Sequence, residues 1–259
     1  MILEYKGINI FYTDQGKGSA IVLLHGFLEN TTMWDTFLPK LTKKNRVICI
    51  DLLGHGKSDC LGYVHTMESM ANAVDAVLRH LKLRKYYMIG HSMGGYVALA
   101  FAEIKPNSLK GLCLMNSTYK ADDEERKKLR VRANKMVQTN FNNMVRMSFA
   151  NLFSEASKIK YKSKFNLALK EALKTSLQGY MACQEGMILR DDKFDMFKSL
   201  PCKKLIIIGE KDPVVNGKEL LIETKNTSIS TVVFSEGHMS HIENEIFFLQ
   251  EILHFIENI

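Results

Sequence analysis

A serine between two glycines is the first feature of this chain that could support covalent chemistry. Gly90, Ser92 and Gly94 form a Gly-x-Ser-x-Gly pattern, directly after the apolar run Tyr86–Ile89. Where a strand turns sharply into a helix, the serine is held in a strained backbone conformation, and glycine two residues away on either side relieves the crowding. The pattern predicts an exposed hydroxyl suited to nucleophilic attack. The competing interpretation is a glycine-rich turn without catalysis.

A serine hydroxyl attacks only when a base takes its proton, and the base needs an acid to orient it. Downstream of Ser92, Asp212 follows the apolar run Lys204–Ile208, and His238 follows Thr231–Phe234. Because all three residues follow apolar runs, we expect them at one carboxyl-terminal edge of a parallel sheet. We therefore predict Ser92 as nucleophile, His238 as general base and Asp212 as the orienting acid.

Other residues compete for these roles. His241 lies three positions after His238, where it could cap the final helix or support the site, and Glu210 is the alternative acid. Asn116 follows another apolar run but carries no charge. A His-x-x-His pair can bind metal, yet no third ligand type stands near it in the sequence, so we predict no metal and no cofactor.

Acyl transfer also needs donors for a developing oxyanion. His25-Gly26-Phe27 ends the apolar run Ala20–Leu24, and Gly26 lets the backbone turn so that the Phe27 amide can face the reacting carbonyl. Met93 is expected to supply the second amide from the turn after Ser92. His25 is expected to brace this loop rather than act as a base.

The scaffold is expected to be α/β, because eight short apolar runs alternate with helical stretches and imply a mostly parallel, eight-stranded sheet covered on both faces. Predicted helices run from a Thr66 cap to Leu81, over Met93–Lys105 up to Pro106, and over Ile242–Ile256. The predicted strands are Ile2–Lys6, Ile8–Thr13, Ala20–Leu24, Arg46–Ile50, Tyr86–Ile89, Leu109–Met115, Lys204–Ile208 and Thr231–Phe234.

Residues 119–198 break this alternation. Apolar residues recur at helical spacing from Leu129 to Leu152 and from Phe165 to Met181, which predicts two long helices joined near Ser154–Lys160. We interpret 119–198 as an inserted helical cap on a core formed by 1–118 and 199–259. Its methionines suggest an adaptable apolar lid, although core packing explains most of them. The residues expected to bind substrate are Phe27, Met93, Met144, Met181, Val214 and Met239.

Charge and composition restrict the partners. The net charge of +7 comes entirely from residues 119–198, which hold 17 basic and 10 acidic residues. These bases are scattered over polar helix faces, so we predict no nucleic-acid binding, and attraction of an anionic substrate is the second interpretation. Strand-sized apolar runs, a start without a signal-peptide pattern and five cysteines without a CxxC pair predict a cytoplasmic protein that does not enter membranes. We expect a monomer or a homodimer, and the sequence does not decide between them.

Together, HGF at His25–Phe27, DxxGxGxS at Asp51–Ser58, GHSMGG at Gly90–Gly95, GxxD at Gly209–Asp212 and GH at Gly237–His238 resemble the α/β-hydrolase superfamily. The spacing is similar to its small single-domain branch of carboxylesterases, carbon–carbon bond hydrolases and the menaquinone-pathway synthase. That resemblance implies an α/β-hydrolase fold and a Ser-His-Asp triad. Leu53 departs from the usual proline of the DxPGxGxS loop, which should not affect catalysis.

The expected activity is hydrolysis of a small carboxylic ester or thioester through an acyl-enzyme, as in carboxylesterases (EC 3.1.1). One alternative is carbon–carbon cleavage or a lyase-type elimination by the same triad. Another is a ligand-binding protein on a hydrolase scaffold.

Overall fold

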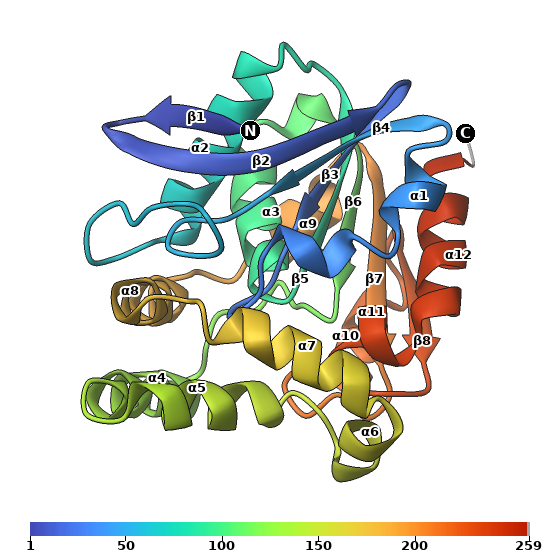
Figure 1. Cartoon of the computed structure of the whole chain (residues 1–259). Helices are drawn as coiled ribbons and strands as arrows, with labels where there is room; N and C mark the ends of the chain where they lie inside the picture. The colour runs from blue at the N-terminus through green and yellow to red at the C-terminus, as the bar shows by residue number, and fades with distance from the viewer. Residues whose placement is uncertain (258–259) are drawn as a thin grey trace.

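The computed structural model describes residues 1–257 and contains a central sheet of eight strands in the order β1-β2-β4-β3-β5-β6-β7-β8 (Figure 1). β2 pairs antiparallel with both β1 and β4, and every pair from β4 to β8 is parallel. The predicted mostly parallel, eight-stranded sheet is therefore confirmed. The strands are β1 (Ile2–Tyr5), β2 (Ile8–Gly16), β3 (Ser19–Leu24), β4 (Asn45–Ile50), β5 (Tyr86–His91), β6 (Leu109–Met115), β7 (Lys203–Gly209) and β8 (Ile229–Phe234).

The central strands are apolar throughout because both faces of the sheet are buried. Successive side chains of a strand point to opposite faces, and β3 shows the consequence. Ile21 and Leu23 join the apolar cluster that includes Phe248 of α12 (Glu245–Glu257), whereas Val22 and Leu24 join the cluster on the opposite face. The second cluster holds α2 (Met67–His80) and α3 (Met93–Ile104) against the sheet.

The helices of the core follow the sequence signals with one exception. The Thr66 hydroxyl accepts a hydrogen bond from the Ser69 amide and caps α2, and α3 ends before Pro106, as predicted. The final helix is split into α11 (Ser240–Glu243) and α12, because Asn244 between them leaves helical backbone geometry. No helix within residues 1–257 is both long and apolar enough to cross a membrane. Short helices complete the core: η1 (Thr31–Trp34), α1 (Leu38–Leu41), η2 (Pro106–Ser108) and α10 (Gly217–Thr224).

The insertion between β6 and β7 contains six helices, so the prediction of two long ones was wrong. The first predicted helix breaks at residues 138–140, and the exposure of Leu129 (59%) and Met136 (42%) shows that its apolar positions do not form one buried stripe. The expected joint near Ser154–Lys160 is itself helical. The six helices are α4 (Glu124–Val137), α5 (Phe141–Ala150), α6 (Glu155–Lys160), α7 (Lys162–Ala172), α8 (Leu177–Ile188) and α9 (Phe194–Ser199).

Helices α4 to α8 lie across the end of the sheet at which β5 and β7 finish (Figure 1). They pack around an apolar cluster of their own, which includes Phe149 and Tyr180 and also takes in Leu28, Met239 and Ile242 from the core. Helix α8 approaches the core very closely, since a Cβ atom on Gly179 would lie 2.1 Å from the Gly54 carbonyl oxygen. The inserted helices are thus fixed onto the edge that carries the predicted site.

Candidate active site

Ser92 stands at the turn from β5 into α3 with φ of +48°, a left-handed value that is rare for a residue other than glycine. The flanking glycines make this turn sterically possible. A Cβ on Gly90 would lie 2.3 Å from the Gly94 carbonyl oxygen, and a Cβ on Gly94 would lie 2.5 Å from that of Leu24. The strained turn holds the hydroxyl beyond the end of the sheet, as the glycine spacing predicted.

The structure brings Ser92, His238 and Asp212 into direct contact, although each comes from a different loop. The Nε2 atom of His238 lies 2.9 Å from the Ser92 Oγ. On the other side of the ring, Nδ1 lies 2.8 Å from Oδ2 and 3.0 Å from Oδ1 of Asp212. This is the geometry in which a carboxylate fixes the imidazole so that its free nitrogen can take the serine proton.

Asp212 is held in place by main-chain and side-chain donors. Its Oδ1 accepts hydrogen bonds from the Val214 and Val215 amides at 2.8 and 3.0 Å, and its Oδ2 accepts one from Asn116 Nδ2 at 3.2 Å. Burial by itself would raise the pKa of Asp212, but the adjacent His238 and the two amides hold it below its ordinary value. The carboxylate is therefore ionised at neutral pH.

The residues that competed for these positions do not occupy them. Glu210 is exposed, whereas Asp212 contacts the imidazole. Asn116 supports the site by bonding both Asp212 and the Gly237 carbonyl at 3.0 Å, a contact the sequence did not reveal. His25 braces its loop, because its Nε2 accepts a hydrogen bond from the Leu52 amide.

The two predicted oxyanion donors belong to segments that adjoin Ser92. Met93 is the first residue of α3, so its amide is one of the donors that a helix leaves without an intrahelical acceptor. In the loop after β3, the amides flanking Phe27 are fixed, since Gly26 donates to Glu29 Oε2 at 2.7 Å and Leu28 donates to His55 Nε2 at 3.2 Å. A Cβ on Gly26 would lie 3.3 Å from the Ser92 Cβ, so this loop passes beside the serine.

A cavity of about 360 Å³ opens over Ser92 and His238, between the core and the inserted helices. Phe27 and Val214, two of the residues predicted to bind substrate, line it. Of the others, Met144 and Met239 are buried in the apolar cluster of the inserted helices and Met181 packs against it, while Met93 is buried in the core. The sequence did not single out Arg126, Arg130, Tyr180 or Gln184, which also line the cavity. The one sequence signal that could have pointed to arginines at the site is the excess of basic residues in 119–198.

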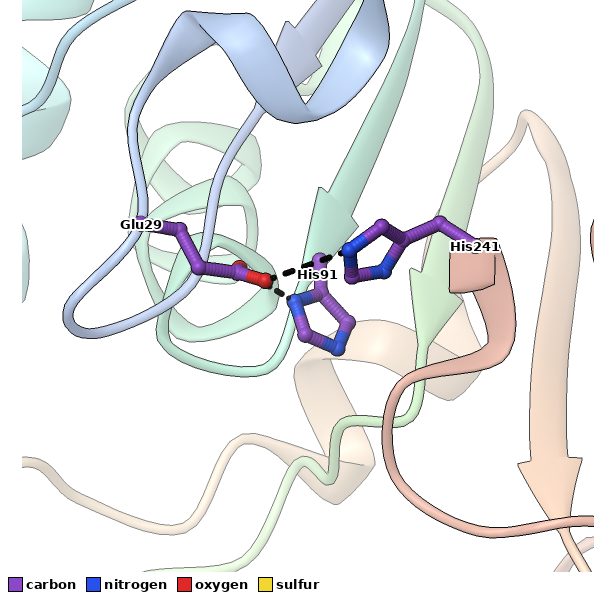
Figure 2. Close-up of side chains that lie close together, drawn as sticks. All are labelled: Glu29, His91 and His241. Atoms are coloured by element: carbon purple, nitrogen blue, oxygen red, sulfur yellow. Dashed lines mark hydrogen bonds and ion pairs between the residues drawn. The ribbon is translucent and has the colours of Figure 1, made fainter. Parts of the chain in front are cut away.

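Behind the serine, Glu29, His91 and His241 converge in a buried cluster (Figure 2). Their donor atoms lie within 4.8 Å of one another, a spacing that a metal ion could use. However, the Glu29 Oε2 and His91 Nδ1 atoms are 2.6 Å apart, which is the length of a charge-assisted hydrogen bond between them. His241, which the sequence allowed either as a helix cap or as a support of the site, lies beside His91 and Glu29.

The family model described as alpha/beta hydrolase fold matches residues 19–245, and the chain belongs to this family. Its fold is similar to that of a thermophilic esterase from Thermogutta terrifontis, solved with malate bound: the two chains are 29% identical with a TM-score of 0.90, and the match covers 98% of this chain and 96% of the esterase.

Two curated relatives show how far the sequence similarity extends. An uncharacterized protein of Mycobacterium tuberculosis is 37% identical over 102 residues, and the matched segment spans 39% of this chain but only 30% of that protein. The (E)-2-((N-methylformamido)methylene)succinate hydrolase of Acinetobacter baylyi is 23% identical over 236 residues, which are 89% of this chain and 88% of that enzyme. The family and the esterase neighbour support hydrolytic activity.

Proposed function

We propose that this chain hydrolyses a small carboxylic ester or thioester through Ser92, His238 and Asp212. The observation that carries the proposal is the unbroken line of contacts from the Asp212 carboxylate through the His238 ring to the Ser92 Oγ at the floor of a cavity. The esterase neighbour supports the choice of an ester bond over other hydrolysable bonds.

In the proposed reaction His238 takes the Ser92 proton as the oxygen attacks the substrate carbonyl carbon. The Phe27 and Met93 amides hold the negative oxygen of the tetrahedral intermediate. His238 then gives the proton to the departing alcohol or thiol, which leaves an acyl group on Ser92. Water, activated by the same imidazole, cleaves this acyl-enzyme, and the protein returns to its starting state.

The test is a panel of 4-nitrophenyl esters and acyl thioesters with wild type and Ser92→Ala. Wild type should turn over short acyl substrates and be labelled by a fluorophosphonate at Ser92, whereas the variant should do neither. Equal turnover by both proteins would contradict the proposal. Absent turnover together with tight, stabilising ligand binding would support a binding protein on a hydrolase scaffold instead.

We further propose that the substrate carries a negative charge away from the scissile bond. Among the described residues that line the cavity there are two arginines and no carboxylate. Arg130 is bonded to Asp122 and Gln184, but Arg126 bonds the Val214 carbonyl rather than an acidic group, so its charge is free to bind an anion. The names of two relatives agree, since one is a succinate-derivative hydrolase and the other was solved with malate.

A matched pair of substrates tests this charge preference: the 4-nitrophenyl ester of hexanoic acid and the 4-nitrophenyl half-ester of adipic acid. Arg126→Gln should lower kcat/KM for the charged half-ester about 10-fold or more, because a hydrogen bond to a charged group is lost, and leave the neutral ester nearly unchanged. Arg132→Gln, at an exposed position of the same helix, is the control. Equal losses for both substrates would contradict a role for Arg126 in charge recognition.

The inserted helices supply these arginines, and we therefore propose that residues 119–198 act as a substrate-binding cap over the core. The cytoplasmic location and the oligomeric state stay predictions from the sequence.

A further inference from the structure

The buried pair Glu29 and His91 links the two halves of the proposed catalytic machinery. The Glu29 Oε2 atom accepts the Gly26 amide at 2.7 Å and lies 2.6 Å from His91 Nδ1. The other ring nitrogen of His91, Nε2, lies 3.0 Å from the main-chain oxygen of His238. A continuous path of hydrogen bonds therefore runs from the loop His25–Phe27 to the residue proposed as general base.

We propose that Glu29 and His91 act as a positioning clamp, which fixes the loop carrying the Phe27 amide and the loop carrying the His238 ring in register over Ser92. The inference rests on the proposed function, because the clamp acts through those groups and touches no substrate atom itself. It goes beyond the triad by assigning a catalytic consequence to two residues behind it.

The proton count of the cluster supports the clamp. Both ring nitrogens of His91 face oxygen atoms, and the His238 carbonyl can only accept a hydrogen bond. Glu29 Oε2 already accepts the Gly26 amide, so a bare carboxylate fits there best. His91 must then carry hydrogen on both nitrogens, as an imidazolium paired with the Glu29 carboxylate.

The electrostatics of the site agree with this assignment. Burial by itself would raise the pKa of Glu29, but the charge and hydrogen bond of His91 lower it to about 2. Burial by itself would lower the pKa of His91, but the charge and hydrogen bond of Glu29, together with the His238 carbonyl and the Asp212 charge, raise that pKa. Burial lowers the pKa of His241 to about 3, so this neighbour is neutral and leaves the single positive charge on His91. The other titratable groups that interact with the cluster are His25, His55, Lys164, His238 and Asp212.

The packing leaves the two loops little freedom while the clamp is intact. A Cβ on Gly26 would lie 2.5 Å from Glu29 Oε2 and 2.8 Å from His91 Nδ1, so the backbone of the oxyanion loop rests directly on the pair. Glu29 and His91 are 6% and 1% exposed, which keeps competing water away from these hydrogen bonds. Loss of the charge should let the Phe27 amide and the His238 ring drift apart, and small displacements of reacting groups are costly to the rate.

The decisive variant is Glu29→Gln, which keeps the side-chain shape and removes the charge. For the best ester found for wild type, we expect kcat to fall about 10- to 100-fold with KM within about 2-fold, because positioning and not binding is lost. The matched control is Glu171→Gln, which bonds Asn30 in the segment after Glu29 but lies outside the clamp, and its kcat should stay near that of wild type. If wild type is active and Glu29→Gln keeps the same kcat, the clamp is overturned and the proposed function stands. If wild type itself hydrolyses no ester, the proposed function is overturned first.

A spectroscopic measurement on wild type keeps the proposal testable if Glu29→Gln does not fold. In ¹⁵N-labelled protein near neutral pH, the His91 ring should show two protonated nitrogens while His241 shows one. A neutral His91 would overturn the clamp. Stoichiometric zinc that shifts the His91 and His241 ring signals would also overturn it, in favour of a metal site.

Discussion

The Nε2 atom of His238 lies 2.9 Å from the Oγ atom of Ser92, and 146 positions of sequence separate the two residues. Two loops at the same edge of the sheet make this contact, one after β5 and one after β8. Each loop is supported from behind, Ser92 by the glycines of its turn and His238 by the carbonyl contact with His91. The relationship between hydroxyl and imidazole can therefore be tested through the groups that hold it.

Replacing the proposed orienting acid should affect the rate far more than the fold. In Asp212→Asn the His238 ring loses the carboxylate that selects its tautomer, and we expect kcat to fall by about 10⁴. Steady-state kinetics with the best ester, together with a thermal melt, measure both properties. Glu210→Gln serves as the control, because this neighbouring carboxylate is exposed and away from the ring. A larger loss in Glu210→Gln than in Asp212→Asn would reverse the assignment.

The strained backbone of Ser92 should cost stability. With φ at +48°, glycine fits the turn better than any side chain, and such strain is worth about 1–3 kcal/mol. The greater freedom of glycine in the unfolded chain offsets part of this gain. We expect Ser92→Gly to unfold in urea with a free energy about 1 kcal/mol higher than Ser92→Ala, with both variants inactive. Equal stability of the two variants would argue against strain at this position.

The Glu29 carboxylate should make folding sensitive to acid. Its pKa is about 2 in the folded protein against 4.5 ordinarily, so its stabilising contribution is complete above pH 4.5 and is lost as the pH falls from there towards 2. Urea unfolding at a series of pH values should show a steeper loss in this window for wild type than for Glu29→Gln. The lowered pKa values of Asp122 and Asp212 act in both proteins, so the difference between the two curves reports Glu29. Parallel curves would contradict the prediction.

A buried charge network should hold segments of the inserted region together. Asp122, whose side chain is fully buried, pairs with Arg130 of α4 at 2.5 Å and with Arg190 at 2.7 Å. Asp122→Asn leaves two guanidinium groups short of a counter-charge, and we expect a loss of about 3 kcal/mol in the free energy of unfolding. The exposed pair Lys198–Asp195 offers a control, since Asp195→Asn should cost less than about 1 kcal/mol. Similar losses in both variants would show that the Asp122 network contributes no more than a surface pair.

The sequence by itself determined the sheet and the order along its edge of the residues that we propose to react. Strands buried on both faces must be apolar throughout, so β5 and β7 could be recognised as continuous runs, and residues that follow parallel strands must meet at one edge. Ser92, Asp212 and His238 could be predicted to converge for this reason. The two glycines around Ser92 could also be recognised from the sequence, because steric crowding in the turn depends on residues only two positions away.

Only the tertiary structure decided how the inserted helices are divided and what they present to the site. The helical spacing of apolar residues continues across residues 138–140, although α4 ends before this segment and α5 begins after it. Helices that pack on one another need no single apolar stripe. Arg126 reaches the cavity, and Glu29 reaches His91 across 62 positions, through packing between distant segments. Those contacts leave no periodic or short-range pattern in the sequence, since burial and charge pairing between distant segments exist only once the chain is folded.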